Sequence, residues 1–159
     1  MDRINHEEIK RMTREQEEYL RFDTFSNEDA LSLGMFITER VYKEGIDLAI
    51  SIRRLNGAII FQHLTEGTDR INQNWMDRKF NTVAYFGHCS LAAWADAEIT
   101  GEDIEFQGLS KKDFAFCGGG FPVRLKSGEL VAVAIVSNLP HMRDHSYLVQ
   151  CIEDYLNEK

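Results

Sequence analysis

The residues best suited to chemistry fall in two segments that lie far apart in the chain. The first segment, residues 75–82, places Arg78 and Lys79 beside aromatic side chains. These two cations could clamp a carboxylate or a phosphate, because guanidinium binds such groups through paired, charge-assisted hydrogen bonds. The second segment is the run Gly118–Gly120, where the backbone is free to adopt positive φ and to approach a ligand closely. The two segments together predict a binding site, provided that the fold brings them together.

Each segment also has a purely structural interpretation. The glycine run precedes a predicted strand and no GK[ST] follows it, so it is not a phosphate loop and could be a bulge or a tight turn. Arg78 and Lys79 could lie on a solvated helical face, paired with acids such as Asp77. The functional interpretation of the run is backbone that lines a pocket or packs against another subunit.

Cysteine and histidine side chains offer two further kinds of chemistry. Cys117 could act as a nucleophile if a base such as His88 activated its thiol, although free cysteine is more often a small buried hydrophobe. His88 could also ligate a haem iron or a metal, or simply donate to a carbonyl at the edge of the core. His141 and His145 share one helix face, as in half of a zinc signature, with a third ligand still required. The predicted site has no metal and no assigned catalytic residue.

Composition limits the class of protein. The chain has 159 residues, 43% of them apolar, which suffices for one core, and its net charge of −8 disfavours nucleic acid and anionic membranes as partners. No apolar run approaches the roughly 18 residues of a membrane span. The charged N-terminus does not resemble a secretory signal, and three cysteines without metal spacing favour a reduced cytoplasmic setting.

Hydrophobic periodicity predicts an antiparallel sheet with helices packed on its faces. Residues 1–25 are predicted to be a helical extension and residues 26–159 a single domain. The expected helices are 3–21, 26–44, 75–97 with a break near Gly87, and 147–156. The expected strands are 46–53, 58–64, 121–125 and 130–136, the last buried on both faces, and residues 65–74 and 101–113 are expected to be connectors.

Several stretches together resemble the haem-degrading (HbpS/GlcG-like) domain family, in particular its small stand-alone branch of uncharacterised proteins. They are residues 74–83, Phe114 with residues 117–123, residues 133–140, and Asp144-His145. The resemblance spans nearly the whole chain after residue 25. It departs from the family at Cys117, where relatives usually have histidine before the glycines.

The resemblance implies a profilin-like α/β/α sandwich with a central antiparallel sheet of about five strands. It also implies ring-like or stacked homo-oligomers and a link to haem binding, sometimes with haem breakdown. A related domain is fused to cobalamin adenosyltransferases, and the stand-alone branch has no settled activity.

The combined expectation is a cytoplasmic homo-oligomer with a pocket beside the glycine run, holding haem or another anionic organic molecule. The expected ligand-binding residues are Trp75, Arg78, Lys79, Asn81, His88, Cys117, Gly118, Gly119, Gly120 and His145. Two alternatives remain open: a non-catalytic assembly or interaction module with the same residues as interface anchors, and a redox or hydrolytic enzyme built on Cys117.

Overall fold

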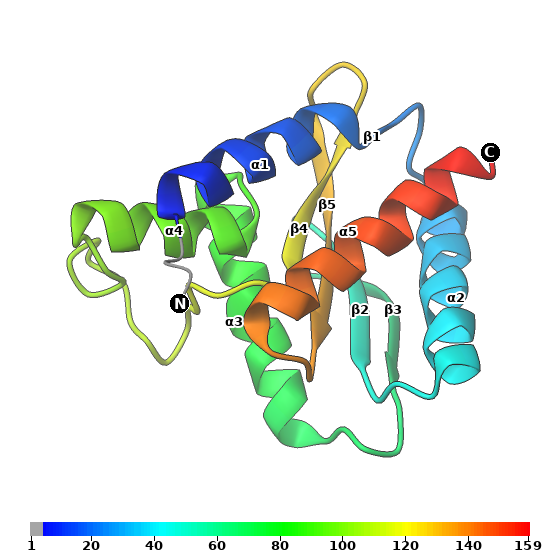
Figure 1. The fold of residues 1–159 in the computed structure, drawn as a ribbon. Helices are drawn as coiled ribbons and strands as arrows, with labels where there is room; N and C mark the ends of the chain where they lie inside the picture. Colours follow the sequence, from blue (N-terminus) through cyan, green and yellow to red (C-terminus); the bar gives the residue numbers. More distant parts are fainter. Residues whose placement is uncertain (1–4) are drawn as a thin grey trace.

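A computed structural model describes residues 5–159 and shows five helices around one sheet (Figure 1). In chain order the elements are α1 (His6–Tyr19), β1 (Arg21–Phe22), α2 (Asn27–Glu44), β2 (Ala49–Arg54), β3 (Ile59–Leu64), α3 (Arg70–Phe86), α4 (Ser90–Thr100), β4 (Gly120–Leu125), β5 (Leu130–Ser137) and α5 (His141–Asn157). The predicted fold class is therefore confirmed, as an α/β fold with five strands.

The sheet has the strand order β1-β4-β5-β2-β3 and is mixed. The pairs β4–β5, β5–β2 and β2–β3 are antiparallel, as expected, whereas β1 pairs with β4 in parallel. The expectation of a fully antiparallel sheet was wrong at this edge, because a strand of two residues is too short to give a periodic pattern. β5 lies at the centre of the sheet. Its C-terminal end, where Ile135 pairs with Gly120, is the end nearest the candidate site.

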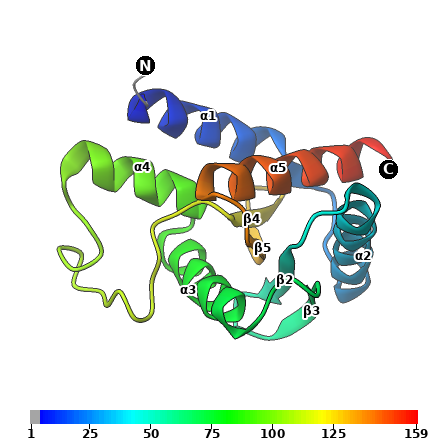
Figure 2. The same cartoon turned by 60° about the horizontal axis from the view of Figure 1, so that its bottom comes forward.

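Helices cover both faces of this sheet, which Figure 2 shows with α5 on one side of the strands and α3 on the other. Val133 and Ile135 of β5 pack with Met76 and Val83 of α3 in a small apolar cluster. The alternate residues of β5 face the larger core that α2 and α5 help to form. The prediction that residues 130–136 are buried on both faces is therefore confirmed.

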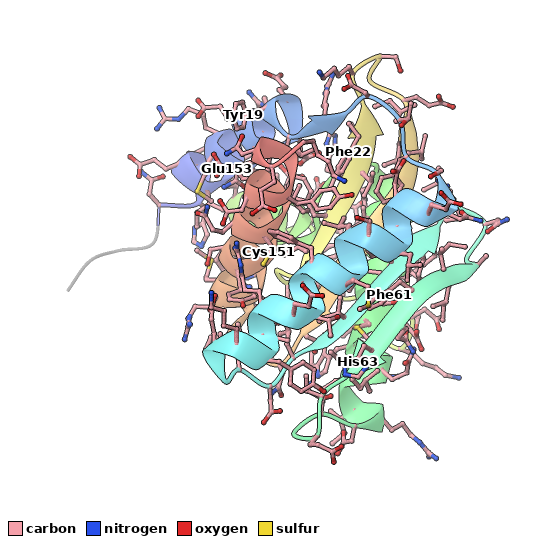
Figure 3. The ribbon with its side chains drawn as sticks, turned by 90° about the vertical axis from the view of Figure 1, so that its right-hand side faces the viewer. Tyr19, Phe22, Phe61, His63, Cys151 and Glu153 are labelled. Carbon is pink, nitrogen blue, oxygen red and sulfur yellow. The ribbon has the colours of Figure 1, made fainter. Side chains whose placement is uncertain are left out.

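On the larger core side, α2 crosses β2 and β3 (Figure 3). Gly34 of α2 permits this close approach, since a Cβ atom there would overlap the ring of Phe61 from β3. Cys151 lies on α5 in the same layer, where its sulfur is 3.9 Å from Nη1 of Arg40. The thiol of Cys151 is buried, and burial raises its pKa to about 11.

Helix boundaries follow local capping. The break predicted near Gly87 is confirmed, because α3 ends at Phe86 and Gly87 adopts a left-handed conformation with φ of 76°. α3 begins earlier than predicted, because Asp69 and Asn72 form a reciprocal capping box, so the expectation of a loop through residue 74 was wrong. β2 begins at Ala49 rather than at residue 46.

α1 packs against α4 and buries Ile9, Thr13 and Glu17. The predicted start of this helix at residue 3 lies outside the described residues, and the division of the chain at residue 25 stays a prediction. In the part of the chain that the structure describes, none of the helices combines the length and the apolar character that crossing a membrane requires.

Candidate functional site

Lys79 projects from the middle of α3 toward the end of β5, where its side chain is almost entirely buried. Its ammonium donates to the carbonyl oxygen of Val136 at 2.9 Å and to Oδ2 of Asp144 at 3.1 Å. A buried ammonium is tolerated only with such partners, because removing a charge from water costs several kcal/mol. Lys79, which the sequence offered as a clamp for an anionic ligand, is therefore one half of a buried ion pair with Asp144.

Asp144 supplies the counter-ion from the first turn of α5 and is as deeply buried as Lys79. Its second oxygen, Oδ1, accepts a hydrogen bond from the backbone N–H of Leu139 at 2.9 Å, which fixes the start of α5. Burial raises the pKa of this carboxyl, while Lys79 acts in the opposite direction. The carboxylate thus joins the beginning of α5 to the middle of α3.

The glycine run lies directly over this ion pair. Gly119 has a φ of 124°, and a Cβ atom there would lie 2.5 Å from Nζ of Lys79 and 2.6 Å from the carbonyl oxygen of Val136. A Cβ atom on Gly118 would overlap the carbonyl oxygen of His141. The two segments singled out in the sequence therefore meet in space, and the glycines are needed because no side chain fits there.

A cleft of about 580 Å³ opens beside these residues, between the first turns of α3 and α5; we name it the α3–α5 cleft. The buried side chains of Lys79 and Asp144 form its floor, and the apolar side chains of Ile71, Trp75 and Leu139 form its lip. The lining residues are Gly67, Asp69, Ile71, Asn72, Trp75, Lys79, Cys117, Ser137, Asn138, Leu139, His141 and Asp144.

Trp75, Arg78 and Asn81 have different surroundings although they share a helix. Trp75 lines the cleft, and the guanidinium of Arg78 stacks on its ring with the carbon 3.9 Å from the ring centroid. Arg78 donates to the carbonyl oxygen of Lys111 at 3.4 Å, and Asn81 donates to that of Asp113 at 2.7 Å. Arg78 and Asn81 therefore hold the connector between α4 and β4, and neither lines the cleft.

His88 lies away from the α3–α5 cleft, in a separate groove of about 300 Å³ between α1 and α4. Its Nδ1 is 3.3 Å from the buried carboxylate of Glu17, which raises the pKa of the imidazole. Glu17 also accepts from the backbone N–H of Cys89 at the start of α4. His88 and Cys117 are thus not brought together as a catalytic pair.

His145 is 1% exposed and does not line the cleft. Its Nε2 lies 2.7 Å from Oε1 of Gln16, so this nitrogen carries the proton and donates to α1. Nδ1 is buried without a hydrogen-bond partner among the described residues. Burial lowers the pKa of His145 to about 4, and the neighbouring His141 acts in the same direction.

This shifted pKa predicts a specific loss of stability in acid. The folded pKa lies below the ordinary value of 6.5, so the contribution is complete above pH 6.5 and is lost as the pH falls toward 4. The free energy of unfolding of the wild-type protein should fall between pH 7 and pH 4.5. In His145→Gln, whose amide still donates to Gln16, we expect this fall to be smaller by roughly 2 kcal/mol. Urea denaturation at both pH values measures this difference.

His88→Gln is the matched control for this experiment. The pKa of His88 is raised, so its contribution is lost as the pH rises, and its removal should not protect the protein in acid. If the free energy of unfolding fell by the same amount between pH 7 and pH 4.5 in wild type and in His145→Gln, the burial of neutral His145 would not be a cause of the loss of stability in acid.

Cys117 is partly exposed at the cleft, whereas Cys89 and Cys151 are buried. Burial raises the pKa of the Cys117 thiol, with Lys79 and Asp144 acting in opposite directions. Its sulfur makes no hydrogen bond to a histidine in the part of the chain that the structure covers. These surroundings keep the thiol protonated and do not activate it as a nucleophile.

Six polar residues of the cleft were not expected as ligand-binding residues: Asp69, Asn72, Ser137, Asn138, His141 and Asp144. His141 was expected only as one of two histidines of an incomplete zinc signature, and Asp144 only as part of the stretch that resembles the family. Nδ1 of His141 instead accepts a hydrogen bond from the backbone N–H of Gly118 at 3.2 Å. Within residues 5–159 no group of three or more histidine, cysteine or acidic side chains is placed to hold a metal. Asn138 has a φ of 147°, a backbone conformation that residues with a side chain rarely adopt.

Comparisons with known proteins identify the family of this chain. The family model of the haem degrading protein HbpS-like family matches residues 25–153. A UPF0303 protein of Yersinia enterocolitica is 35% identical over 138 residues, which is 86% of this chain and 82% of the relative. A UPF0303 protein of Yersinia pseudotuberculosis is 33% identical over 144 residues, which is 89% of this chain and 83% of the relative.

Two solved structures show the same arrangement of elements. The crystal structure of the Ybr137w protein aligns with a TM-score of 0.85 and 28% identity, over 99% of this chain and 90% of that protein. The crystal structure of HbpS aligns with a TM-score of 0.64 and 20% identity, over 82% of this chain and 89% of that one, which shows the fold alone. On the family match and the UPF0303 relatives, the chain belongs to the HbpS-like haem-degrading domain family.

Proposed function

We propose that this protein binds a small molecule and that the α3–α5 cleft is its ligand site. The observation that carries the proposal is the Lys79–Asp144 pair, in which both side chains are 3% exposed at the floor of an open cleft. A buried ion pair is not needed for stability, since well-packed apolar residues of similar volume do as well or better. Charged groups held in a concave, partly apolar site are typical of ligand recognition.

Haem is the ligand named in the family description and in the solved structure of a PduOC:Heme complex. That structure aligns with this chain at 14% identity and a TM-score of 0.61. The side chains near the cleft do not fit a haem iron. His145 is closed off and bonded to Gln16, and the Cys117 thiol has a raised pKa. Nδ1 of His141 accepts from Gly118, which leaves the proton on Nε2, where an iron would need a lone pair. The proposal therefore concerns a ligand other than haem.

Blocking the cleft at Cys117 tests the site. A mixture of small ring acids and ring amides should show binding to the wild-type protein in saturation-transfer NMR. Modification of Cys117 with a benzyl methanethiosulfonate, carried to completion under mildly alkaline conditions that form the thiolate and checked by intact mass, should abolish these signals, because the added ring occupies the cleft beside Lys79.

Cys117→Ser is the matched control, since it preserves the cleft and cannot be modified. Its binding signals should survive the same treatment. Signals that persist in modified wild-type protein would place small-molecule binding elsewhere and overturn the proposal.

Self-assembly is a second candidate function, and an exposed apolar stripe on α2 favours it. Leu31, Met35 and Tyr42 lie on one face of this helix and are 52%, 45% and 56% exposed. Such a stripe is typical of a helix that packs against another subunit. Sedimentation velocity should then show an assembly that Met35→Glu dissociates and Trp75→Ala does not. A monomer at every concentration would contradict this candidate.

A further inference from the structure

We infer that the α3–α5 cleft binds a planar ring compound that carries one carboxylate group. This inference rests on the proposed function and adds the chemical class of the ligand. Two features of the cleft support it, the hydrogen bonds that its floor can still make and its apolar lip, and the charge of the lining limits the ligand to one negative group.

The floor of the cleft offers protons rather than lone pairs. Lys79 has three ammonium protons, and residues 5–159 supply acceptors for two of them. Nε2 of His141 keeps its proton because Nδ1 accepts from Gly118. Burial and Lys79 lower the pKa of His141, so the imidazole is neutral at neutral pH.

Four side-chain oxygens of the cleft, from Asp144, Asn72 and Asn138, already accept a hydrogen bond. Both oxygens of Asp144 are occupied, one by Lys79 and one by the N–H of Leu139. The side-chain oxygen of Asn72 accepts from the N–H of Asp69, and that of Asn138 accepts from Asn72. A complementary ligand must therefore present acceptor oxygens to Lys79 and His141.

The charge balance disfavours ligands with more than one negative charge, because the lining holds one ammonium and two carboxylates. Asp144 compensates Lys79, and the carboxylate of Asp69 lies on the rim with its oxygen on the N–H of Ile71. Arg78 lies outside the lining, against Trp75 and the carbonyl of Lys111. The start of α5, which no side-chain hydrogen bond from its N-cap Pro140 closes, adds a partial positive charge. A phosphate or a diacid is therefore disfavoured, and a single carboxylate would be held by its hydrogen bonds to Lys79 and His141 rather than by the net charge of the cleft.

The lip of the cleft favours a flat apolar body. Ile71 and Trp75 are one turn apart on α3 and are 68% and 37% exposed, and Leu139 adds a third apolar side chain. Arg78 covers part of the indole ring of Trp75. An aromatic ring of the ligand would stack on the exposed part of this indole, while its carboxylate reaches Lys79 and His141.

Benzoate and benzamide are the probes that test this inference, because they share a ring, while the amide is neutral and has an NH2 donor in place of one acceptor oxygen. At pH 7.5, saturation-transfer titrations should give benzoate a dissociation constant at least tenfold lower than that of benzamide. Cyclohexanecarboxylate, which has the charge without the flat ring, should also bind more weakly than benzoate. Equal affinities for benzoate and benzamide would overturn the carboxylate, and equal affinities for the two acids would overturn the planar ring.

Two substitutions of His141 locate the carboxylate. His141→Asn keeps an acceptor for the N–H of Gly118 and removes the donor at Nε2, so benzoate affinity should fall at least fivefold. His141→Gln keeps a donor near Nε2 and should bind benzoate within twofold of wild type. The reverse order would remove His141 from the ligand site.

The outcomes separate this inference from the proposed function. Modification of Cys117 could abolish the binding of ring compounds while benzoate and benzamide have equal dissociation constants. The cleft would then remain the ligand site, and the inferred ligand class would be wrong. If modification of Cys117 leaves all binding unchanged, the proposed site is wrong as well.

Discussion

Replacing Lys79 by methionine is expected to lower the free energy of unfolding by about 3–5 kcal/mol, because it leaves the carboxylate of Asp144 buried without its counter-ion. Methionine has nearly the same length as lysine, so the packing of α3 on β5 is retained. The hydrogen bond to the carbonyl of Val136 is lost with the ammonium. Urea denaturation at pH 7 measures the loss, which is a large part of the 5–15 kcal/mol that stabilises a typical domain.

A double substitution separates the missing charge partner from damage to packing. Asp144→Asn keeps an oxygen for the N–H of Leu139 and removes the charge. In the Lys79→Met/Asp144→Asn protein we expect most of the lost stability to return, since no unpaired charge remains buried. A double variant as unstable as the sum of the two single variants would show that Lys79 and Asp144 do not act as a pair.

Gly119→Ala is expected to cost at least about 3 kcal/mol, from backbone strain together with overpacking. The φ of 124° at this position is one that side chains rarely adopt, and the new methyl group would press on Nζ of Lys79 and the carbonyl of Val136. Gly119 also accepts a hydrogen bond from the N–H of Val136 at 2.8 Å, so its backbone has little room to shift. Thermal and urea denaturation both report this loss.

Gly108→Ala is the control for the conformational part of this effect. Gly108 also has a positive φ, of 79°, yet a Cβ atom there meets nothing within 4 Å. Its replacement should cost about 1–2 kcal/mol, the usual penalty of a left-handed residue with a side chain. If both alanine variants lose the same stability, the glycine run does not lie tightly over the ion pair.

The strands and helix ends with strong local signals could be predicted from the sequence. Residues 130–136 form an unbroken apolar run, and they became the central strand because a strand covered on both faces buries consecutive side chains, here from Ala132 onward. Gly87 ends α3 because it adopts a left-handed conformation readily. β1 could not be predicted, since its two residues pair with β4 only because the chain passes the sheet edge there. The capping box at Asp69 was overlooked within a polar stretch.

The site could be predicted in part. Lys79 and the glycine run, which the sequence singles out separately, do meet in the structure, whereas the burial of Lys79 and its pairing with Asp144 were not predicted. Arg78 precedes Lys79 by one residue and therefore points about 100° away around the helix, toward the connector rather than the cleft. His88 depends on Glu17, 71 residues earlier, a tertiary contact that no local pattern reveals. Asn138 and His141 lie beside Lys79 only because α5 begins where β5 ends.

The rate at which a methanethiosulfonate reagent modifies Cys117, measured by intact mass with and without benzoate, tests most directly whether the ligand occupies the cleft over the Lys79–Asp144 pair. Cys117 is the partly exposed cysteine of the cleft, and Cys89 and Cys151 are buried. We expect a single adduct on Cys117 that forms at least fivefold more slowly at saturating benzoate. An unchanged rate while benzoate is bound would place the ligand away from Lys79 and Asp144 and contradict the account.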